Sequence, residues 1–155
     1  MALSEASKKE IASLKTRYPD RAAATLPALY VVQRERELVD DEGVREVAAL
    51  LELDEIRVRE VATWYTMYHK HPVGKHLVEI CTNLSCHLTG GQELLDSVCH
   101  ELGVKPGETT ADGRFTVHEV ECLGSCGTAP ALQVDGDFHE NMTPEKVAAV
   151  LRAAD

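Results

Sequence analysis

The sequence predicts an α+β fold, in which a block of helices is followed by a small sheet with further helices packed on it. Apolar residues recur at helical spacing up to about His69. The chain changes character at His71-Pro72-Val73-Gly74, where proline and glycine interrupt the pattern. Beyond that point, short apolar runs alternate with turn signals. These observations predict two domains, residues 1–70 and residues 71–155.

Helices are expected throughout the first domain. They are predicted over Ser4 to Tyr18, from Thr25 to about Glu37, from Asp40 through Leu51, and from Asp54 onward. The second helix has Pro27 in its first turn, where proline is tolerated, and the fourth has Asp54 in the N-cap position. The apolar side of the fourth helix is predicted to consist of Val58, Val61, Trp64, Tyr65 and Tyr68.

The second domain is expected to combine strands and helices. Strands are predicted over His76–Ile80, around Phe115–Val120, and over Ala131–Val134 and Asp137–His139, with helices over Gln92–Leu102 and from Thr143 to about Leu151. Gly103 stands where a helix commonly ends, and Asp135-Gly136 is a strong hairpin signal. The order β-α-β-β-β-α fits a small sheet with helices packed on it, as in thioredoxin-like domains.

Two short cysteine loops follow the first two predicted strands. Cys81 and Cys86 enclose four residues, whereas Cys122 and Cys126 enclose three. The thirty-five residues between the loops are enough for a helix and a returning strand, so both loops are expected at one end of the sheet. Four thiolates in two pairs suit a centre with two metal atoms, and a [2Fe–2S] cluster takes four cysteine ligands.

Other uses of these cysteines stay open at this point. A structural zinc site is the main alternative, although zinc ribbons usually carry narrower two-residue gaps. A Rieske centre needs two histidine ligands and thioredoxin-type catalysis needs C-x-x-C, and neither pattern fits the two loops. Complete internal disulfide pairing is excluded because the cysteine count, five, is odd. The fifth, Cys99, shares a helical face with Leu95 and Val98 and is expected to be a core residue.

Composition and charge argue against several classes of partner. The chain has 155 residues and a formal net charge of −10, which disfavours nucleic acid and anionic membrane surfaces. No apolar run approaches the roughly 18 residues that a membrane span requires, and Met1 to Glu10 lack the apolar core of a signal peptide. We therefore expect a cytoplasmic protein without direct membrane insertion, in a compartment where thiols stay reduced.

Longer segments resemble a known family. They include Leu26-Pro27-Ala28-Leu29-Tyr30, Val61-Ala62-Thr63-Trp64-Tyr65-Thr66-Met67-Tyr68, Cys81-Thr82-Asn83-Leu84-Ser85-Cys86 and Glu119-Val120-Glu121-Cys122-Leu123-Gly124-Ser125-Cys126-Gly127-Thr128-Ala129-Pro130. From about Tyr18 to Leu151 the chain resembles the thioredoxin-like [2Fe–2S] subunit, of the E-subunit type, of bacterial respiratory NADH:quinone oxidoreductase (complex I). Trp64 stands where that family often has phenylalanine.

The resemblance implies a fold, a cofactor and a ligand set. The fold would be an N-terminal helical bundle used for subunit docking, followed by a thioredoxin-like [2Fe–2S] ferredoxin domain. Cys81, Cys86, Cys122 and Cys126 would ligate the [2Fe–2S] cluster. The cluster would exchange single electrons with the FMN of a partner flavoprotein subunit, which also binds NADH and a [4Fe–4S] cluster.

The resemblance also implies a place in the cell. The chain would be a non-catalytic redox subunit of the respiratory chain, with no catalytic residue or substrate site of its own. It would lie in the peripheral arm of a membrane complex, on the cytoplasmic side. The same fold and cysteine loops are shared by the diaphorase subunit of NAD-linked hydrogenases and formate dehydrogenases. A free thioredoxin-like ferredoxin is a further alternative.

Overall fold

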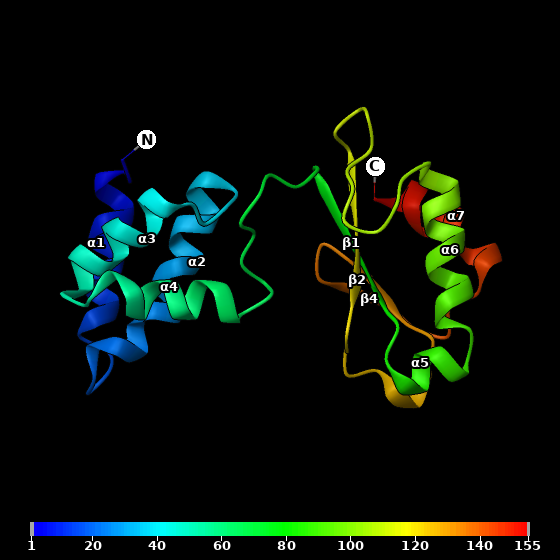
Figure 1. Cartoon of the computed structure of the whole chain (residues 1–155), viewed down its shortest axis with the longest axis horizontal. Coiled ribbons are helices and arrows are strands. Elements are labelled where there is room, and N and C mark those ends of the chain that lie inside the picture. Colours follow the sequence, from blue (N-terminus) through cyan, green and yellow to red (C-terminus); the bar gives the residue numbers. More distant parts are fainter. Residues whose placement is uncertain (1, 155) are drawn as a thin grey trace. The chain divides into compact units, whose positions relative to one another are not determined.

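A computed structural model describes residues 2–154 and divides the chain into two compact units, Met1–Pro72 and Val73–Asp155. We call the first the helical unit and the second the sheet unit. Each unit has a hydrophobic core of its own. Figure 1 shows helices in the first unit and a sheet with helices in the second. The predicted α+β class is confirmed.

The helical unit is built from short helices around a common core. Its elements are α1 (Glu5–Lys15), the 3-10 turn η1 (Arg21–Ala24), α2 (Thr25–Arg36), α3 (Asp41–Leu51) and α4 (Glu55–Trp64). Side-chain oxygens of Ser4, Asp20 and Asp40 cap α1, η1 and α3 by accepting backbone N–H groups of the following turn. The fully buried core includes Ile11, Leu29, Val32, Val47, Leu51 and Val58.

The end of α4 differs from the sequence prediction. The helix stops at Trp64, and Tyr65 adopts an extended backbone. The expected apolar side is therefore divided: Val58 is fully buried, whereas the Trp64 side chain is 81% exposed. Tyr68 lies beyond the helix and is still buried in the core of the helical unit, where its hydroxyl donates to the Leu26 carbonyl at 2.9 Å.

The sheet unit contains a mixed sheet. Its elements are β1 (His76–Cys81), α5 (Leu84–Leu88), α6 (Gly91–Leu102), β2 (Phe115–Val120), the 3-10 turn η2 (Cys126–Thr128), β3 (Leu132–Val134), β4 (Asp137–His139) and α7 (Pro144–Ala153). The strand order is β2-β1-β3-β4. β1 pairs in parallel with β2 and antiparallel with β3, and β3 pairs antiparallel with β4. A parallel pair needs a crossover connection, which α5 and α6 supply here.

Local signals place the remaining elements of the sheet unit. Asp135 and Gly136 both have positive φ, 53° and 91°, as the two-residue turn of the β3–β4 hairpin requires. Thr143 and Pro144 open α7 at the predicted positions. α6 and α7 lie side by side (Figure 1). Leu94, Val98 and Leu151 join residues of the strands in one buried cluster. Within residues 2–154, no helix combines the length and the apolar character that crossing a bilayer demands.

Candidate metal centre

The two cysteine loops meet where β1 and β2 end. Cys81 is the last residue of β1 and Cys86 lies in α5, while Cys122 follows β2 and Cys126 opens η2. Because β1 and β2 are parallel, with Cys81 opposite Val120, their carboxyl ends lie at the same edge of the sheet. All four cysteines line one cavity of about 180 Å³ at this edge. The expected meeting of the two loops at one end of the sheet is confirmed.

The two cysteine pairs differ in their exposure to solvent. Cys81 and Cys86 are buried, with exposed fractions of 4% and 3%. Cys122 and Cys126 are exposed. The inner pair sits on a strand and a helix, whereas the outer pair sits on a loop and a 3-10 turn. The cavity therefore has one side that faces the protein and one side that faces solvent.

The first loop is shaped by α5, which the sequence analysis did not predict. The Asn83 side chain accepts the Leu84 N–H at 2.6 Å and so starts the helix. Within α5 the Cys86 side chain is buried, whereas Leu84 and Leu88 are 69% and 76% exposed. Five residues are too few to show a helical period in the sequence.

Gly91 holds the start of α6 against this loop. A Cβ built on Gly91 would lie 2.8 Å from the carbonyl group of Cys86 and 2.9 Å from the carbonyl oxygen of Cys81. Because both contacts are with backbone atoms, no larger residue fits without moving the loop that carries the inner cysteines. The sequence predicts this helix only from Gln92, and a sequence does not show the backbone contacts that require glycine at position 91.

The second loop is shaped by Gly124. Its φ of +80° lies in the region that favours glycine. Its N–H donates to the Cys122 sulfur at 3.3 Å. Backbone N–H groups that donate to ligand sulfurs tune the reduction potential of an iron–sulfur cluster. The Gly124 N–H is therefore placed to tune a centre that Cys122 binds.

The cysteines are close enough to influence one another's ionisation. Burial, followed by the hydrogen bond and charge of Cys81, raises the pKa of the Cys86 thiol, and the Ala131 N–H only partly offsets this. A bound metal cation compensates such costs, because cysteine binds metals as a thiolate. Cys99, in contrast, packs against the sheet-unit core as predicted, and burial raises the pKa of its thiol.

A [2Fe–2S] cluster fits the chemistry of this donor set, because it takes four thiolates, two for each iron. Across residues 2–154, no group of three or more His, Cys, Asp and Glu side chains is placed closely enough to hold one metal ion together. The fit accordingly rests on the shared cavity and on the identity of its four sulfur donors.

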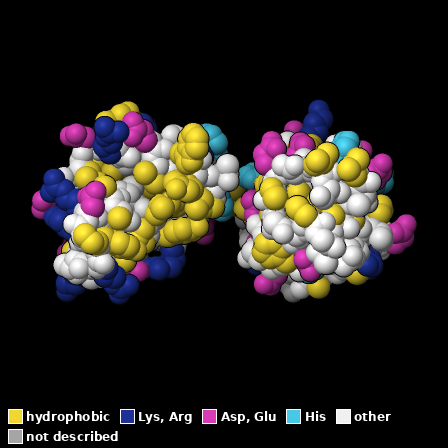
Figure 2. Space-filling model, turned by 90° about the horizontal axis from the view of Figure 1, so that it is seen from below, with side chains coloured by type: hydrophobic (Ala, Val, Ile, Leu, Met, Phe, Trp, Pro, Cys, Tyr) yellow, Lys and Arg dark blue, Asp and Glu magenta, His cyan; other side chains and the backbone are white. Residues whose placement is uncertain are grey.

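A second candidate site lies on the helical unit. We call Tyr30, Trp64, Tyr65 and Met67 the aromatic surface; their exposed fractions are 46%, 81%, 36% and 38%. The buried Tyr68 supports this surface, with ring centroids 5.3 Å from Tyr30 and 6.5 Å from Tyr65. The face of the helical unit seen in Figure 2 carries a broad hydrophobic patch.

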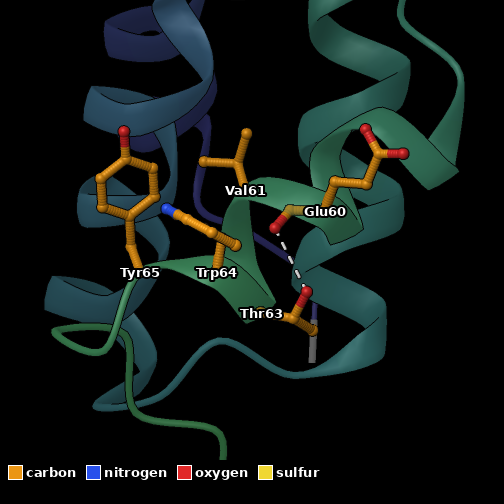
Figure 3. Close-up of a pocket in the computed structure, with 5 residues that line it drawn as sticks. All are labelled: Glu60, Val61, Thr63, Trp64 and Tyr65. Carbon is orange, nitrogen blue, oxygen red and sulfur yellow. Dashed lines mark hydrogen bonds between the residues drawn. The ribbon is translucent and has the colours of Figure 1, made fainter.

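A shallow cavity of about 530 Å³ adjoins Trp64 and Tyr65. Figure 3 shows the side chains of Val61, Trp64 and Tyr65 gathered on one side of the end of α4, with Glu60 and Thr63 on the other. Tryptophan and tyrosine are the residues most enriched at energetically dominant contacts between proteins. The aromatic surface therefore has the composition of a protein-binding site.

The comparison with protein families decides the class of the chain. A family model described as thioredoxin-like [2Fe-2S] ferredoxin matches residues 11–155. The chain belongs to the thioredoxin-like [2Fe-2S] ferredoxin family. Membership covers both units and agrees with the fold predicted for the second.

Within the thioredoxin-like [2Fe-2S] ferredoxin family, the chain is similar to named bacterial proteins. It is 40% identical over 146 residues to the E 2 subunit of NADH-quinone oxidoreductase from Rhizobium meliloti (strain 1021), covering 94% of this chain and 87% of that protein. It is 36% identical over 149 residues to the E subunit of NADH-quinone oxidoreductase from Escherichia coli (strain K12), covering 96% of this chain and 90% of that protein. The resemblance to the E-subunit type is confirmed.

A solved structure shares the fold of this family member. An NAD+-reducing [NiFe]-hydrogenase in the H2-reduced state superimposes with a TM-score of 0.72 and 22% identity. The match covers 86% of this chain but only 22% of the hydrogenase chain. At this identity the likeness concerns the fold alone.

Proposed function

We propose that the chain is the electron-transfer subunit of an NADH:quinone oxidoreductase and that Cys81, Cys86, Cys122 and Cys126 hold its [2Fe–2S] cluster. The observation that carries the proposal is the single cavity that these four cysteines line, although they come from two loops far apart in sequence. The identity of 36–40% to E subunits supports the assignment to this complex.

When bound, the cluster supplies one-electron storage, with one ferric iron becoming ferrous. NADH releases two electrons together as a hydride, so the hydride step belongs to the FMN of the partner subunit, which then passes electrons on singly. The four cysteines of the chain would bind the irons. The protein shields the cavity from solvent on the side of Cys81 and Cys86 and leaves it open to solvent on the side of Cys122 and Cys126. No catalytic residue is required of this chain.

The helical unit is proposed to dock on the flavoprotein subunit that binds NADH, FMN and a [4Fe–4S] cluster. The exposure of Trp64 supports this role, because an indole ring that is 81% exposed contributes little to the core of its own unit. The complex would place the chain in the peripheral arm on the cytoplasmic side of the membrane.

The test is anaerobic purification followed by iron and sulfide assays and by EPR of the dithionite-reduced chain. We expect two irons and two sulfides per chain and a signal from one unpaired electron. The same signal should appear with NADH only after the flavoprotein subunit is added, and the two proteins should co-elute in size-exclusion chromatography. A colourless protein that holds one zinc ion and accepts no electron contradicts the proposal.

A further inference from the structure

The chain that connects the two units is held by the helical unit as far as His69. The Gln33 side chain on α2 donates to the Met67 carbonyl at 3.0 Å and accepts the His69 N–H at 2.7 Å. The His69 carbonyl accepts the Val39 N–H at 2.7 Å. Tyr68, between Met67 and His69, is buried in the core. The helical unit therefore fixes the backbone up to this point.

The sheet unit holds the chain again from Gly74. The Gly74 N–H donates to the Thr116 hydroxyl at 2.6 Å. The Lys75 N–H donates to the Gly113 carbonyl at 3.0 Å. A Cβ built on Gly74 would lie 3.0 Å from the same carbonyl oxygen, so there is little room for a larger residue at this position. The backbone is therefore fixed from Gly74 onward.

Four residues, Lys70 to Val73, lie between these two anchored points, and we call them the tether. Among residues 2–154, no hydrogen bond or ion pair joins any of the four to another residue, and they belong to no helix or strand. Lys70, His71 and Pro72 are exposed. Lys70 and His71 border a cavity of about 590 Å³ on the helical unit, which leaves their side chains room to change conformation.

The tether is short and tends to stay extended. From the His69 Cα to the Gly74 Cα the chain makes five residue steps, which span at most about 18 Å. Pro72 has a fixed φ and no N–H group, and it biases His71 towards an extended backbone. The remaining backbone bonds of the tether are free to rotate, because no hydrogen bond fixes them. The tether therefore limits the distance between the two anchored points more than their orientation.

The units on either side of the tether offer different surface chemistry. Residues 73–155 contain five Lys and Arg and thirteen Asp and Glu, a formal charge of −8. Residues 1–72 contain eleven and thirteen, a formal charge of −2. The helical unit instead presents the aromatic surface, on which Trp64 is 81% exposed. A partner that contacts both units therefore needs two binding sites, one basic and one apolar.

We propose that the tether is a hinge about which the two units reorient in the free chain, and that the flavoprotein subunit binds the chain bivalently, with one site for each unit. This inference rests on the proposed function. Once one unit is bound, the tether raises the effective concentration of the other, so the whole chain binds more tightly than either unit. On the partner, the positions of His69 and Gly74 then lie no more than about 18 Å apart.

The hinge is tested on the cluster-loaded full chain by nitrogen-15 NMR relaxation, which reports how fast each unit tumbles. We expect residues of the helical unit and of the sheet unit to give two different rotational correlation times, both shorter than that of a rigid body of 155 residues. Adding the FMN-loaded flavoprotein subunit should bring both units to the slow tumbling of the complex. A single correlation time for the free chain overturns the inference.

Bivalent binding is tested by lengthening the tether. Eight or sixteen Gly and Ser residues inserted between His71 and Pro72 are expected to raise the Kd for the flavoprotein about fourfold and about ninefold, because effective concentration falls as the −3/2 power of tether length. The EPR signal and the unfolding midpoint should match the wild type, since the anchoring hydrogen bonds lie outside the insertion. His71→Ala keeps the length and is the control that should bind like the wild type.

Two other results of the insertions overturn the bivalent contact. A wild-type Kd for both insertions shows that one unit alone supplies the affinity. A loss of about a hundredfold or more with eight inserted residues shows that the two units bind as one rigid body. Failure of the proposed function looks different, because the wild-type chain itself then neither binds the flavoprotein nor is reduced by NADH. The relaxation experiment on the free chain decides the hinge in that case too.

Discussion

The two units carry their candidate functional residues in opposite ways. In the sheet unit these residues are cysteines of two loops that follow β1 and β2, within a domain of formal charge −8. In the helical unit they are aromatic side chains left exposed on a domain whose charges nearly balance. A metal site can therefore be predicted from the residue types and their spacing in the sequence. A docking surface can be predicted only when the burial of each side chain is known from the structure.

The charges of the helical unit serve mainly to join its helices. Lys15 pairs with Glu52 at 2.6 Å and Arg59 pairs with Asp41 at 2.6 Å, each linking two elements. Arg36, whose side chain is 8% exposed, pairs with Asp40 at 2.8 Å and also with Glu46. The aromatic surface thus belongs to a unit whose helices are joined by ion pairs.

The largest effect should come from removing one inner cysteine. We expect Cys86→Ser to abolish the EPR signal of the reduced chain, because a serine oxygen at a site that is 3% exposed is a poor substitute for thiolate. Cys99→Ala is the matched control and should keep full iron, sulfide and signal. A normal signal in Cys86→Ser would show that this cysteine is not a ligand.

Truncating one core side chain in each unit should show that the two hydrophobic cores contribute differently to cluster binding. Leu29→Ala in the helical unit and Leu94→Ala in the sheet unit both remove a side chain with no exposed surface, and each should cost about 2–5 kcal/mol in the free energy of unfolding. Chemical denaturation followed by circular dichroism measures this loss. Leu29→Ala should leave the EPR line shape intact, whereas Leu94→Ala should weaken cluster retention. Equal damage to the cluster by both variants would argue against separate cores.

The next effect concerns the packing behind the inner cysteines. Gly91→Ala should cost about 1–3 kcal/mol and reduce the cluster content, because the new methyl group meets the backbone of Cys81 and Cys86. Gly127→Ala, in the outer loop, is the control, since a Cβ there meets no atom of the described chain within 4 Å. Iron per chain after desalting gives the comparison. Wild-type iron content in Gly91→Ala would contradict this account.

The aromatic surface predicts an effect on association without one on folding. Trp64→Ser should weaken binding to the flavoprotein subunit by about 2 kcal/mol, the range of a dominant contact, measured by calorimetry. Its unfolding midpoint should match that of the wild type, because Trp64 is 81% exposed. Trp64→Phe should retain most of the affinity. Unchanged binding by Trp64→Ser would remove this surface from the interface.

The smallest effect should be on the stability of the helical unit at low pH. The Ser7 hydroxyl and the Ser4 N–H lower the pKa of Glu35. Burial alone would raise the pKa of Asp40, but the Gly43 N–H and Arg36 outweigh it and lower the pKa. Carboxyls with lowered pKa values stabilise the fold above their unfolded pKa, and this stabilisation is lost as the pH falls through the folded pKa.

We therefore expect the helical unit to lose helical circular dichroism below about pH 4, where unfolded carboxyls begin to protonate. Glu35→Gln should make this acid transition shallower, because the residue no longer titrates. An acid transition identical to that of the wild type would show that Glu35 contributes nothing to it.

Much of this architecture could be predicted from the sequence because its signals are local. The Asp135-Gly136 turn and the Thr143-Pro144 helix start each depend on two adjacent residues, and both were found where predicted. The convergence of the cysteine loops followed from the order of strands. Tyr65 and Tyr68 were assigned to α4 because helical periodicity was extended past Trp64, the true end of the helix. Trp64 itself lies in the helix, but its side chain is exposed and not part of the core. Gly91 was missed because its role depends on how the backbone of Cys81 and Cys86 folds back against it, which the sequence does not show.

The unequal exposure of the two cysteine pairs has a consequence for assembly. Cys81 lies in a strand and Cys86 in a helix, and both are buried. These two cysteines are therefore in place once the sheet unit folds. The exposed Cys122 and Cys126 face solvent, so iron and oxidants can reach the cavity from their side. A partner seated on that side would close this route. On the proposed function, we expect the cluster to be inserted before the chain joins its partner, and the complex to protect its iron from chelators that strip the isolated chain.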